Sequence, residues 1–256
     1  QHHGLDVFQI TNGRNKFLRN IQKRFLITNT IKHLNNADIN IGVSNLVLQQ
    51  LRNYKGYNPQ NEFVLFNGVD RSKFFKKETV KNDIFTIGCV ANFWKIKDHI
   101  TLIKSTQRIL ESGIKIKLRL IGSGPTFRSC QKYVLNNNLS KYIFFEKEIS
   151  HDKLNNFYNS IDLFVLPSLY EALGCVYLES WATNTPFIGI EGQGISELIV
   201  EEEKKIILAK VNSIESLMEK ILIRYNKRES YPFNSRYEIQ NTIFDFLSLN
   251  IFKKYD

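Results

Sequence analysis

Two glutamates in the segment PSLYEALGCVYLES, Glu171 and Glu179, stand eight residues apart and are the side chains best suited to chemistry. In one helix they would lie about 12 Å apart, at a rise of roughly 1.5 Å per residue. That separation exceeds the roughly 5 to 9.5 Å between the two carboxyl groups of a glycosidase. An extended ligand such as a nucleotide-sugar fits better, with one carboxylate at the reacting sugar and one deeper along the ligand. An interpretation without function is equally favoured, in which Glu171 is stabilised by the dipole at a helix start and Glu179 is a surface glutamate.

Gly174 lies between the two glutamates, near the expected start of the helix. Glycine lets the backbone approach a ligand closely, and the first free amides of a helix favour a phosphate or a sugar oxygen. Gly122 and Gly124 in IGSGP form only part of a dinucleotide fingerprint, because Phe127 stands where its third glycine would fall. These two glycines therefore favour a turn that closes packing.

The elements that must position these residues alternate from about Ile84 onward, as in βαβ units around a parallel sheet. We expect strands at 84–90, 115–121, 142–146, 162–167, 186–190 and 205–208. Helices are expected at 98–112, 126–138, 151–159, 175–184 and 195–201, with Ser150 and Ser196 as caps. The fold class is α/β, a doubly wound parallel sheet. Ligands of such sheets bind outside the carboxyl ends of the strands, here after Val90, Ile121, Glu146 and Pro167.

The chain before Ile84 has a different pattern. A basic helix at 15–37 leads to a strand at 39–43, a short helix and the segment FVLFNGVD, which suits the rear of a second α/β domain. The stretch 237–252 reads as an amphipathic helix that could cross back onto that domain. We expect boundaries at 1–75, 76–232 and 233–256. Because the chain begins at Gln1 and its only methionine is Met218, we expect a fragment that lacks the first strands.

The charge of +10 is uneven, since residues 1–80 hold 12 Lys or Arg against 5 Asp or Glu. Such an excess attracts nucleic acid, anionic lipid or phosphorylated substrates. A basic helix face that is merely solvated, without a binding partner, is an equally favoured interpretation. A DNA-binding protein would rest on this charge alone, without a recognition motif. No apolar run approaches the roughly 20 residues of a membrane span. Cys89, Cys130 and Cys175 lack CxxC spacing, which argues against disulfides and structural zinc and favours a cytoplasmic location.

The segment PSLYEALGCVYLESWATNTPFIGIEGQGISELI closely resembles the E-x7-E segment of glycosyltransferase family 4, which has the two-domain GT-B fold. FVLFNGVDRSKF resembles the entrance to the nucleotide domain, GCVANFWKIKDHITLI its first strand and phosphate loop, and LIGSGP the next glycine turn. NADINIGVSN and QHHGLDVF resemble the rear of the acceptor domain. The resemblance implies a nucleotide-sugar domain of GT-B type joined to the rear part of a truncated N-terminal Rossmann-like domain.

The resemblance also implies roles at the donor. Glu179 would accept hydrogen bonds from the ribose hydroxyls, and the amides of Gly174, Cys175 and Val176 would lie by the diphosphate or the sugar. The family often places an arginine beside the first strand, where this chain has Asn92, which carries no charge. The expected donor-binding residues are Asn92, Lys97, Gly122, Gly124, Gly174, Cys175, Val176 and Glu179.

The implied catalytic residues are Glu171, which would face the donor sugar, and Lys97, which would balance the charge on the leaving diphosphate. Alone, Lys97 reads as a solvated lysine. Because Asn92 replaces the family's arginine, Lys97 would neutralise more of the diphosphate charge, unless Lys95 or Arg71 contributes. His3 in HHGLD matches the family's HG-x-D element and would point toward the donor sugar, although His2 competes for that role.

The expected function is a retaining glycosyltransferase that moves a hexosyl group from a nucleoside-diphosphate sugar to a hydroxyl acceptor in cell-surface polysaccharide or glycolipid synthesis. We expect no cofactor and no metal, and a UDP-sugar rather than a GDP-sugar as donor. Expected partners are a saccharide or lipid-linked saccharide acceptor and an anionic membrane surface at the inner face, but no nucleic acid. The alternative is a catalytically incomplete module that holds a nucleotide-sugar. An NAD-dependent oxidoreductase would need a glycine fingerprint and a downstream acid that the sequence lacks.

Overall fold

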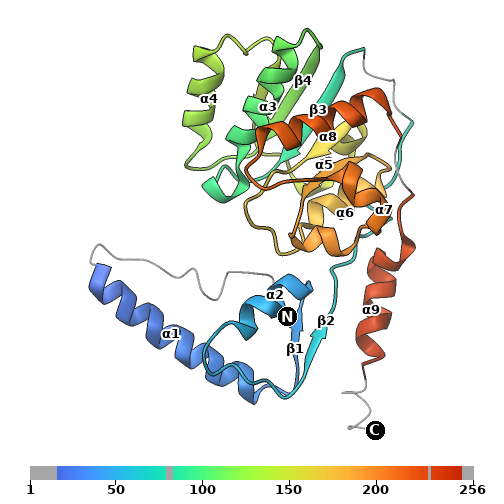
Figure 1. Ribbon diagram of the computed structural model, residues 1–256. Helices are drawn as coiled ribbons and strands as arrows, with labels where there is room; N and C mark the ends of the chain where they lie inside the picture. The colour runs from blue at the N-terminus through green and yellow to red at the C-terminus, as the bar shows by residue number, and fades with distance from the viewer. Residues whose placement is uncertain (1–15, 79–82, 230–231, 250–256) are drawn as a thin grey trace.

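The computed structural model of the chain describes residues 16–78, 83–229 and 232–249 (Figure 1). Within them, the back unit (residues 83–229) is built on a six-stranded parallel sheet with the order β5-β4-β3-β6-β7-β8. The strands are β3 (Phe85–Val90), β4 (Ile116–Ile121), β5 (Ile143–Glu146), β6 (Leu163–Val165), β7 (Phe187–Ile190) and β8 (Leu208–Ala209). This sheet confirms the predicted α/β, doubly wound fold class.

Helices cover both faces of the sheet, which is why β6 and β7 consist entirely of buried residues. On one face α3 (His99–Glu111) packs against α4 (Phe127–Asn136) and α8 (Ile214–Asn226), and on the other α5 (His151–Asn159) packs against α6 (Cys175–Ala182). The sequence prediction omitted α8. Its apolar positions Leu217 and Ile221 are buried at helical spacing, so the signal was present.

The order of the strands determines where a ligand can bind. β3 lies at the centre, with β4 and β5 added on one side and β6, β7 and β8 on the other. The connections therefore diverge at the boundary between β3 and β6, where Ile87 pairs with Leu163. In an open α/β sheet the crevice at this switch point, at the carboxyl ends of the strands, is the usual ligand site. The loops after β3 and β6 carry Lys97 and Glu171.

The expected elements after β7 are wrong in detail. The predicted helix at 195–201 is a 3-10 turn, η3 (Gly194–Glu197), and the predicted strand at 205–208 is largely the helix α7 (Glu201–Ile207). Only Leu208 of that segment belongs to a strand. Three glutamates in the first turn of α7 and two lysines in its last turn complement the helix dipole, and this favours a helix over the β propensity of the isoleucines.

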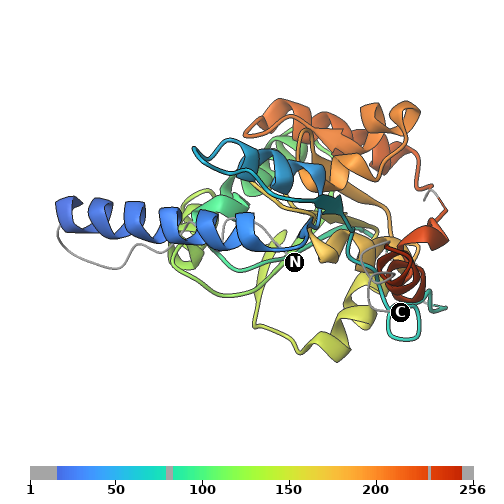
Figure 2. The same cartoon turned by 90° about the horizontal axis from the view of Figure 1, so that it is seen from below.

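The front unit (residues 16–69) holds a two-stranded parallel sheet of β1 (Asn40–Gly42) and β2 (Glu62–Val64). Helix α2 (Asn45–Arg52) packs on it through Leu48 and Leu51. Helix α1 (Lys16–Asn36) agrees with the basic helix expected at 15–37, and it projects away from the rest of the chain (Figure 2).

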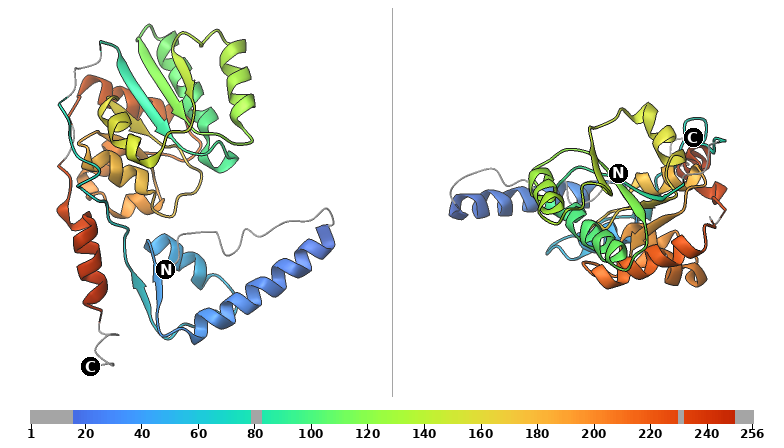
Figure 3. Two further views of the ribbon diagram at one scale, coloured as in Figure 1. Left: turned by 180° about the vertical axis from the view of Figure 1, so that it is seen from behind. Right: turned by 90° about the horizontal axis from the view of Figure 1, so that it is seen from above.

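The C-terminal helix α9 (Ile239–Leu247) lies beside the front unit (Figure 3). Phe246 and Leu249 pack with Ile41 of β1 and Leu65, and Val69 and Ile239 are joined by a backbone hydrogen bond of 3.0 Å. These contacts connect the end of the described chain to the front unit, whereas the domain boundaries at 75 and 232 stay predictions.

Candidate functional site

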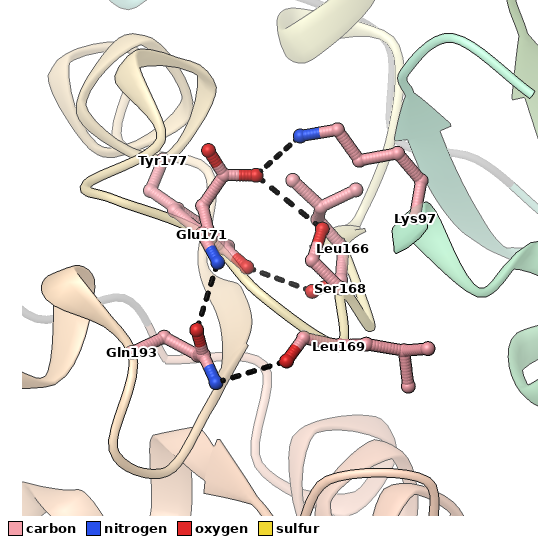
Figure 4. A network of polar contacts seen from close by, with 7 residues as sticks. All are labelled: Lys97, Leu166, Ser168, Leu169, Glu171, Tyr177 and Gln193. Atoms are coloured by element: carbon pink, nitrogen blue, oxygen red, sulfur yellow. Dashed lines mark hydrogen bonds and ion pairs between the residues drawn. The ribbon is translucent and has the colours of Figure 1, made fainter. Parts of the chain in front are cut away.

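The two residues expected to carry the chemistry, Lys97 and Glu171, form an ion pair (Figure 4). The Lys97 ammonium lies 2.5 Å from Oε2 of Glu171, and the same oxygen accepts a hydrogen bond of 3.3 Å from the Ser168 hydroxyl. The side chains are partly buried, with 25% of Lys97 and 14% of Glu171 exposed. The structure thus brings together at the switch point two charges that lie 74 residues apart in the sequence.

The loops that carry this pair are joined through their backbones. The amide of Leu169 donates to the carbonyl of Ile96 over 2.8 Å. Lys97 closes a short 3-10 turn, and Asp98 after it takes the left-handed conformation at φ 49°. The next residue, His99, is buried and stacks on Phe93 with ring centroids 3.9 Å apart. Burial lowers the pKa of His99 to about 4, so its ring is neutral near pH 7 and anchors the loop.

The backbone of Glu171 is held from a third segment, which sequence reasoning missed. Its backbone amide donates a hydrogen bond of 2.8 Å to the side-chain oxygen of Gln193 (Figure 4). The side-chain NH₂ of Gln193 in turn donates a hydrogen bond of 3.3 Å to the carbonyl oxygen of Leu169. The amide of Gly194 donates 3.0 Å to the Glu171 carbonyl. Gln193 follows β7, the strand beside β6, so the rule that ligands gather at carboxyl ends of strands could have found it.

Gly174 is the residue before helix α6, with φ 80° and ψ 82°. A Cβ at this position would lie 2.7 Å from the Tyr177 ring and 3.0 Å from the Cγ of Glu171, so the turn between Glu171 and the helix has room only for glycine. Cys175 and Val176 form the first turn of α6, where backbone amides point along the helix axis. The Cys175 sulfur accepts a hydrogen bond of 3.2 Å from Asn67 of the front unit.

Glu179 lies within α6, whereas Glu171 precedes this helix, so the two glutamates do not share one helix. Glu179 is 7% exposed. Its Oε2 accepts 2.8 Å from the hydroxyl of Tyr158, and its Oε1 lies 3.3 Å from Nε2 of His151. His151 is exposed and opens α5, so Oε1, the outer oxygen, lies toward an exposed side chain, whereas Oε2 lies toward the buried Tyr158. Neither Tyr158 nor His151 was predicted from the sequence as a residue of the site.

Gly122 and Gly124 pack against the loop after β3. A Cβ on Gly122 would lie 2.1 Å from the carbonyl oxygen of Ala91, and one on Gly124 would lie 2.8 Å from that of Phe93. Both glycines have positive φ, at 142° and 148°. These contacts support the interpretation of a turn that closes packing. The side chain of Ser123 between them donates to Glu148, which joins this turn to the loop after β5.

The remaining expected residues are less engaged with the ion pair. Asn92 is exposed beside β3. Arg71, considered as a second phosphate cation, lies 3.5 Å from Glu238 and stacks over Phe233, where it joins the linker to the C-terminal segment. His3 and its competitor His2 lie outside the described residues.

The described residues contain no group of three or more His, Cys, Asp or Glu side chains that could hold a metal ion. None of the described helices is both long enough and apolar enough to cross a membrane. The expectation of a metal-independent reaction stays a prediction.

Two curated relatives illustrate the similarity to known proteins. The capsular polysaccharide biosynthesis glycosyltransferase CapM of Staphylococcus aureus is 29% identical over 229 residues, which are 84% of this chain and 56% of CapM. The O-antigen chain mannosyltransferase RfbU of Salmonella typhimurium is 24% identical over 88% of this chain and 62% of its own length. The chain thus spans little more than half the length of these relatives.

Solved structures share the fold at lower sequence identity. The sucrose-phosphate synthase of Thermosynechococcus elongatus superposes with a TM-score of 0.76 at 19% identity, covering 99% of this chain and 66% of the synthase. Anabaena HepE, solved with UDP and glucose, superposes with a TM-score of 0.73 at 16% identity, covering 88% of this chain and 67% of HepE. These neighbours agree with the GT-B type of fold.

The sequence model of the family described as "Glycosyl transferases group 1" matches residues 70–236, which is well over half of the chain. The match runs from the linker through every strand of the back unit and includes Lys97, Glu171 and Glu179. The chain therefore belongs to the group 1 glycosyl transferases.

Proposed function

We propose that the chain supplies the donor site of a retaining glycosyltransferase, which moves a hexosyl group from a nucleoside-diphosphate sugar to a hydroxyl acceptor. The observation that carries this proposal is the ion pair of Lys97 and Glu171 at the switch point of the sheet, next to the start of α6. Under the same proposal the chain is a member of family 4 within this group, and the spacing of Glu171 and Glu179 supports that assignment.

Each residue has a part in this reaction. The outer oxygen of Glu179 accepts from the ribose, and the amides of Gly174, Cys175 and Val176 face the diphosphate. As the bond between the sugar carbon and the phosphate oxygen breaks, the Lys97 ammonium group moves from Glu171 toward the leaving diphosphate and neutralises its growing negative charge. The acceptor oxygen forms the new bond on the same face of the sugar, and its proton passes to the departing phosphate oxygen. His3, which lies outside the described residues, has the role at the donor sugar that the family resemblance implies.

The donor is a UDP-sugar in preference to a GDP-sugar, and the reaction needs neither cofactor nor metal. The support for UDP is analogy with the HepE structure that holds UDP and glucose. After dialysis of the chain against EDTA, titration with UDP and GDP tests the choice of base, and an assay of donor turnover on the same protein tests metal independence. Tighter binding of GDP would overturn the choice of base, and recovery of turnover only on adding Mg²⁺ or Mn²⁺ would overturn metal independence.

The acceptor is a saccharide or lipid-linked saccharide of a cell-surface polymer or glycolipid, used at the cytoplasmic face of the membrane. Support comes from the polymer names of CapM and RfbU and from the basic front end. In α1, Arg24 and Phe25 are exposed together, and anionic headgroups attract each basic residue by about 1 kcal/mol near the surface. Co-sedimentation with phosphatidylserine vesicles should occur in low salt and vanish in high salt. Its absence in low salt would remove the membrane from the proposal.

The decisive experiment compares Glu171→Gln with wild type in donor turnover and nucleotide binding. Glutamine keeps the size of the side chain and removes its charge, so we expect turnover to fall by about 100-fold or more while the affinity for the nucleotide changes little. Glu191→Gln, an exposed glutamate after β7, is the matched control and should behave as wild type. Unchanged turnover in Glu171→Gln would contradict the assignment.

The alternative, a module that binds a nucleotide-sugar without transferring it, has one observation in its favour. The front unit contributes only a two-stranded sheet among the described residues. Nucleotide binding by the chain, together with no transfer to any saccharide acceptor, would support this alternative over the enzyme.

A further inference from the structure

One carboxylate of the back unit caps a helix of the front unit. Glu197, at the end of η3, reaches α2, where its Oε2 accepts 2.8 Å from the amide of Asn45 and 3.1 Å from the Asn45 side chain. Its Oε1 accepts 2.9 Å from the amide of Leu46. The first amides of a helix have no partner within the helix, and a negative charge there is favoured by the dipole. The start of α2 is therefore completed by the opposite unit.

A second contact between the units lies one residue away. Ser44, the N-cap of α2, is fully buried and accepts 3.4 Å from the amide of Val47. Its hydroxyl donates 2.5 Å to the carbonyl of Ala172, the residue that follows Glu171. The front unit therefore touches the backbone of the proposed sugar-binding loop directly.

The segment that ends in Glu197 also holds this loop from its other side. Gln193 accepts from the amide of Glu171, and Gly194 donates to its carbonyl. A Cβ on Gly194 would lie 1.7 Å from the carbonyl oxygen of Ala172, so the two backbones are in direct contact. A shift of the segment 193–197 must therefore move the backbone of Glu171.

These contacts close a ring of hydrogen bonds across the two units. It runs from Ser44 to Ala172, along the backbone to Glu171, across to Gln193 and Gly194, and through Glu197 back to α2. We propose that Glu197 is a positioning residue, which couples the docking of the front unit to the placement of Glu171 opposite Lys97. This inference rests on the proposed role of Glu171 in sugar transfer.

The chemistry requires a carboxylate at this position. Both oxygens of Glu197 accept from the start of α2, and a carboxylate consists of acceptors only. A glutamine offers one acceptor and would set its own NH₂ against a backbone N–H. Glu197→Gln therefore keeps the volume of the side chain and breaks one side of the cap.

The first test is independent of catalysis. Hydrogen exchange at the amides of Asn45 and Leu46 is measured by NMR in wild type, Glu197→Gln and Glu197→Ala. We expect exchange to become about tenfold faster or more in both variants, because these amides lose a charged acceptor. Glu202→Gln, an exposed glutamate of α7, serves as the control and should leave both rates unchanged. Unchanged rates in Glu197→Ala would overturn the coupling.

The second test separates positioning from donor binding. In Glu197→Gln, kcat should fall about tenfold, while the dissociation constant for the nucleoside diphosphate stays within about twofold of wild type. Ser44→Ala, which removes the contact from the front side, should give the same split. An equal loss in nucleotide affinity, or an unchanged kcat, would overturn the inference.

The proposed function can fail separately from this inference. A wild-type chain that binds no nucleotide-sugar would end the enzymatic proposal, whereas the exchange rates at α2 would still show whether Glu197 couples the two units. If Glu197→Ala does not fold, the same measurements on Glu197→Gln and Ser44→Ala decide, because these substitutions change the side-chain volume little.

Discussion

Replacing Glu179 by alanine should weaken nucleotide binding through the loss of one oxygen rather than two. Oε2 is engaged with the buried hydroxyl of Tyr158, and Oε1 lies toward the exposed His151. A ribose hydroxyl would therefore donate to Oε1. One hydrogen bond to a charged group is worth about 1.5–3 kcal/mol, and each 1.4 kcal/mol corresponds to about tenfold in affinity. We expect the dissociation constant of the nucleoside diphosphate to rise roughly 10- to 150-fold.

The same substitution leaves a buried hydroxyl without its acceptor. Tyr158 is fully buried, and burial beside the Glu179 carboxylate raises the pKa of its phenol well above the usual value, so it stays protonated. An unpaired buried group costs about 1–3 kcal/mol, which corresponds to about 2–4 °C in Tm per kcal/mol for a chain of this size. Glu179→Ala should therefore lose stability as well as affinity.

Tyr158→Phe separates the two effects, because it removes the inner partner and leaves the carboxylate in place. We expect this variant to bind the nucleotide within about threefold of wild type. Calorimetric titration at 20 °C, on variants shown by circular dichroism to be folded, measures both. The reasoning is refuted if Glu179→Ala binds as tightly as wild type, or if Tyr158→Phe weakens binding as much as Glu179→Ala does.

Three further outcomes follow from geometry already described. Lys97→Ala should lower kcat about 100- to 1000-fold, since it removes the cation beside the leaving group, and a loss below about tenfold would contradict its role. In urea unfolding, the free energy of unfolding of Gly122→Ala should be at least about 1 kcal/mol lower than that of Gly113→Ala. Both glycines have positive φ, but only at position 122 would an added Cβ lie 2.1 Å from a carbonyl oxygen. Equal losses in the two variants would argue against the packing role of Gly122. The pKa of His99 is about 6.5 in the unfolded chain but about 4 in the folded chain, because burial disfavours the charged ring. Between these two values only the unfolded chain binds the proton, so the free energy of unfolding should fall as pH drops from 6.5 to about 4. His99→Phe should remove up to about 3 kcal/mol of that fall, and an unaltered pH profile would refute the assignment.

Much of the back unit could be predicted because β3, β6 and β7 are buried along nearly their whole length and therefore form short apolar runs in the sequence. The positions of Lys97 and Glu171 in loops after two of these strands follow from the same pattern, whereas the order of the strands comes from the structure. The segment 195–208 could not be predicted this way, because its isoleucines suit a strand while the charges of Glu201 and Lys205 favour a helix.

The partners of the predicted site residues were harder to find. Tyr158 and His151 meet Glu179 only because α5 packs against α6, and Gln193 reaches Glu171 only because β7 lies beside β6. Such contacts depend on tertiary packing, which spacing along one sequence does not contain. The position of a glutamate in the motif was predictable, but its hydrogen-bond partners were not.

The backbone bond between Leu169 and Ile96 has a consequence for how this site can diversify. Since neither donor nor acceptor belongs to a side chain, substitution of Ile96, or of Leu169 by any residue except proline, keeps the groups that link the two loops. The spacing of Lys97 and Glu171 is thereby insulated from sequence drift at exposed neighbours such as Trp94. Substitutions around the site can therefore accumulate while the Lys97–Glu171 pair keeps its separation.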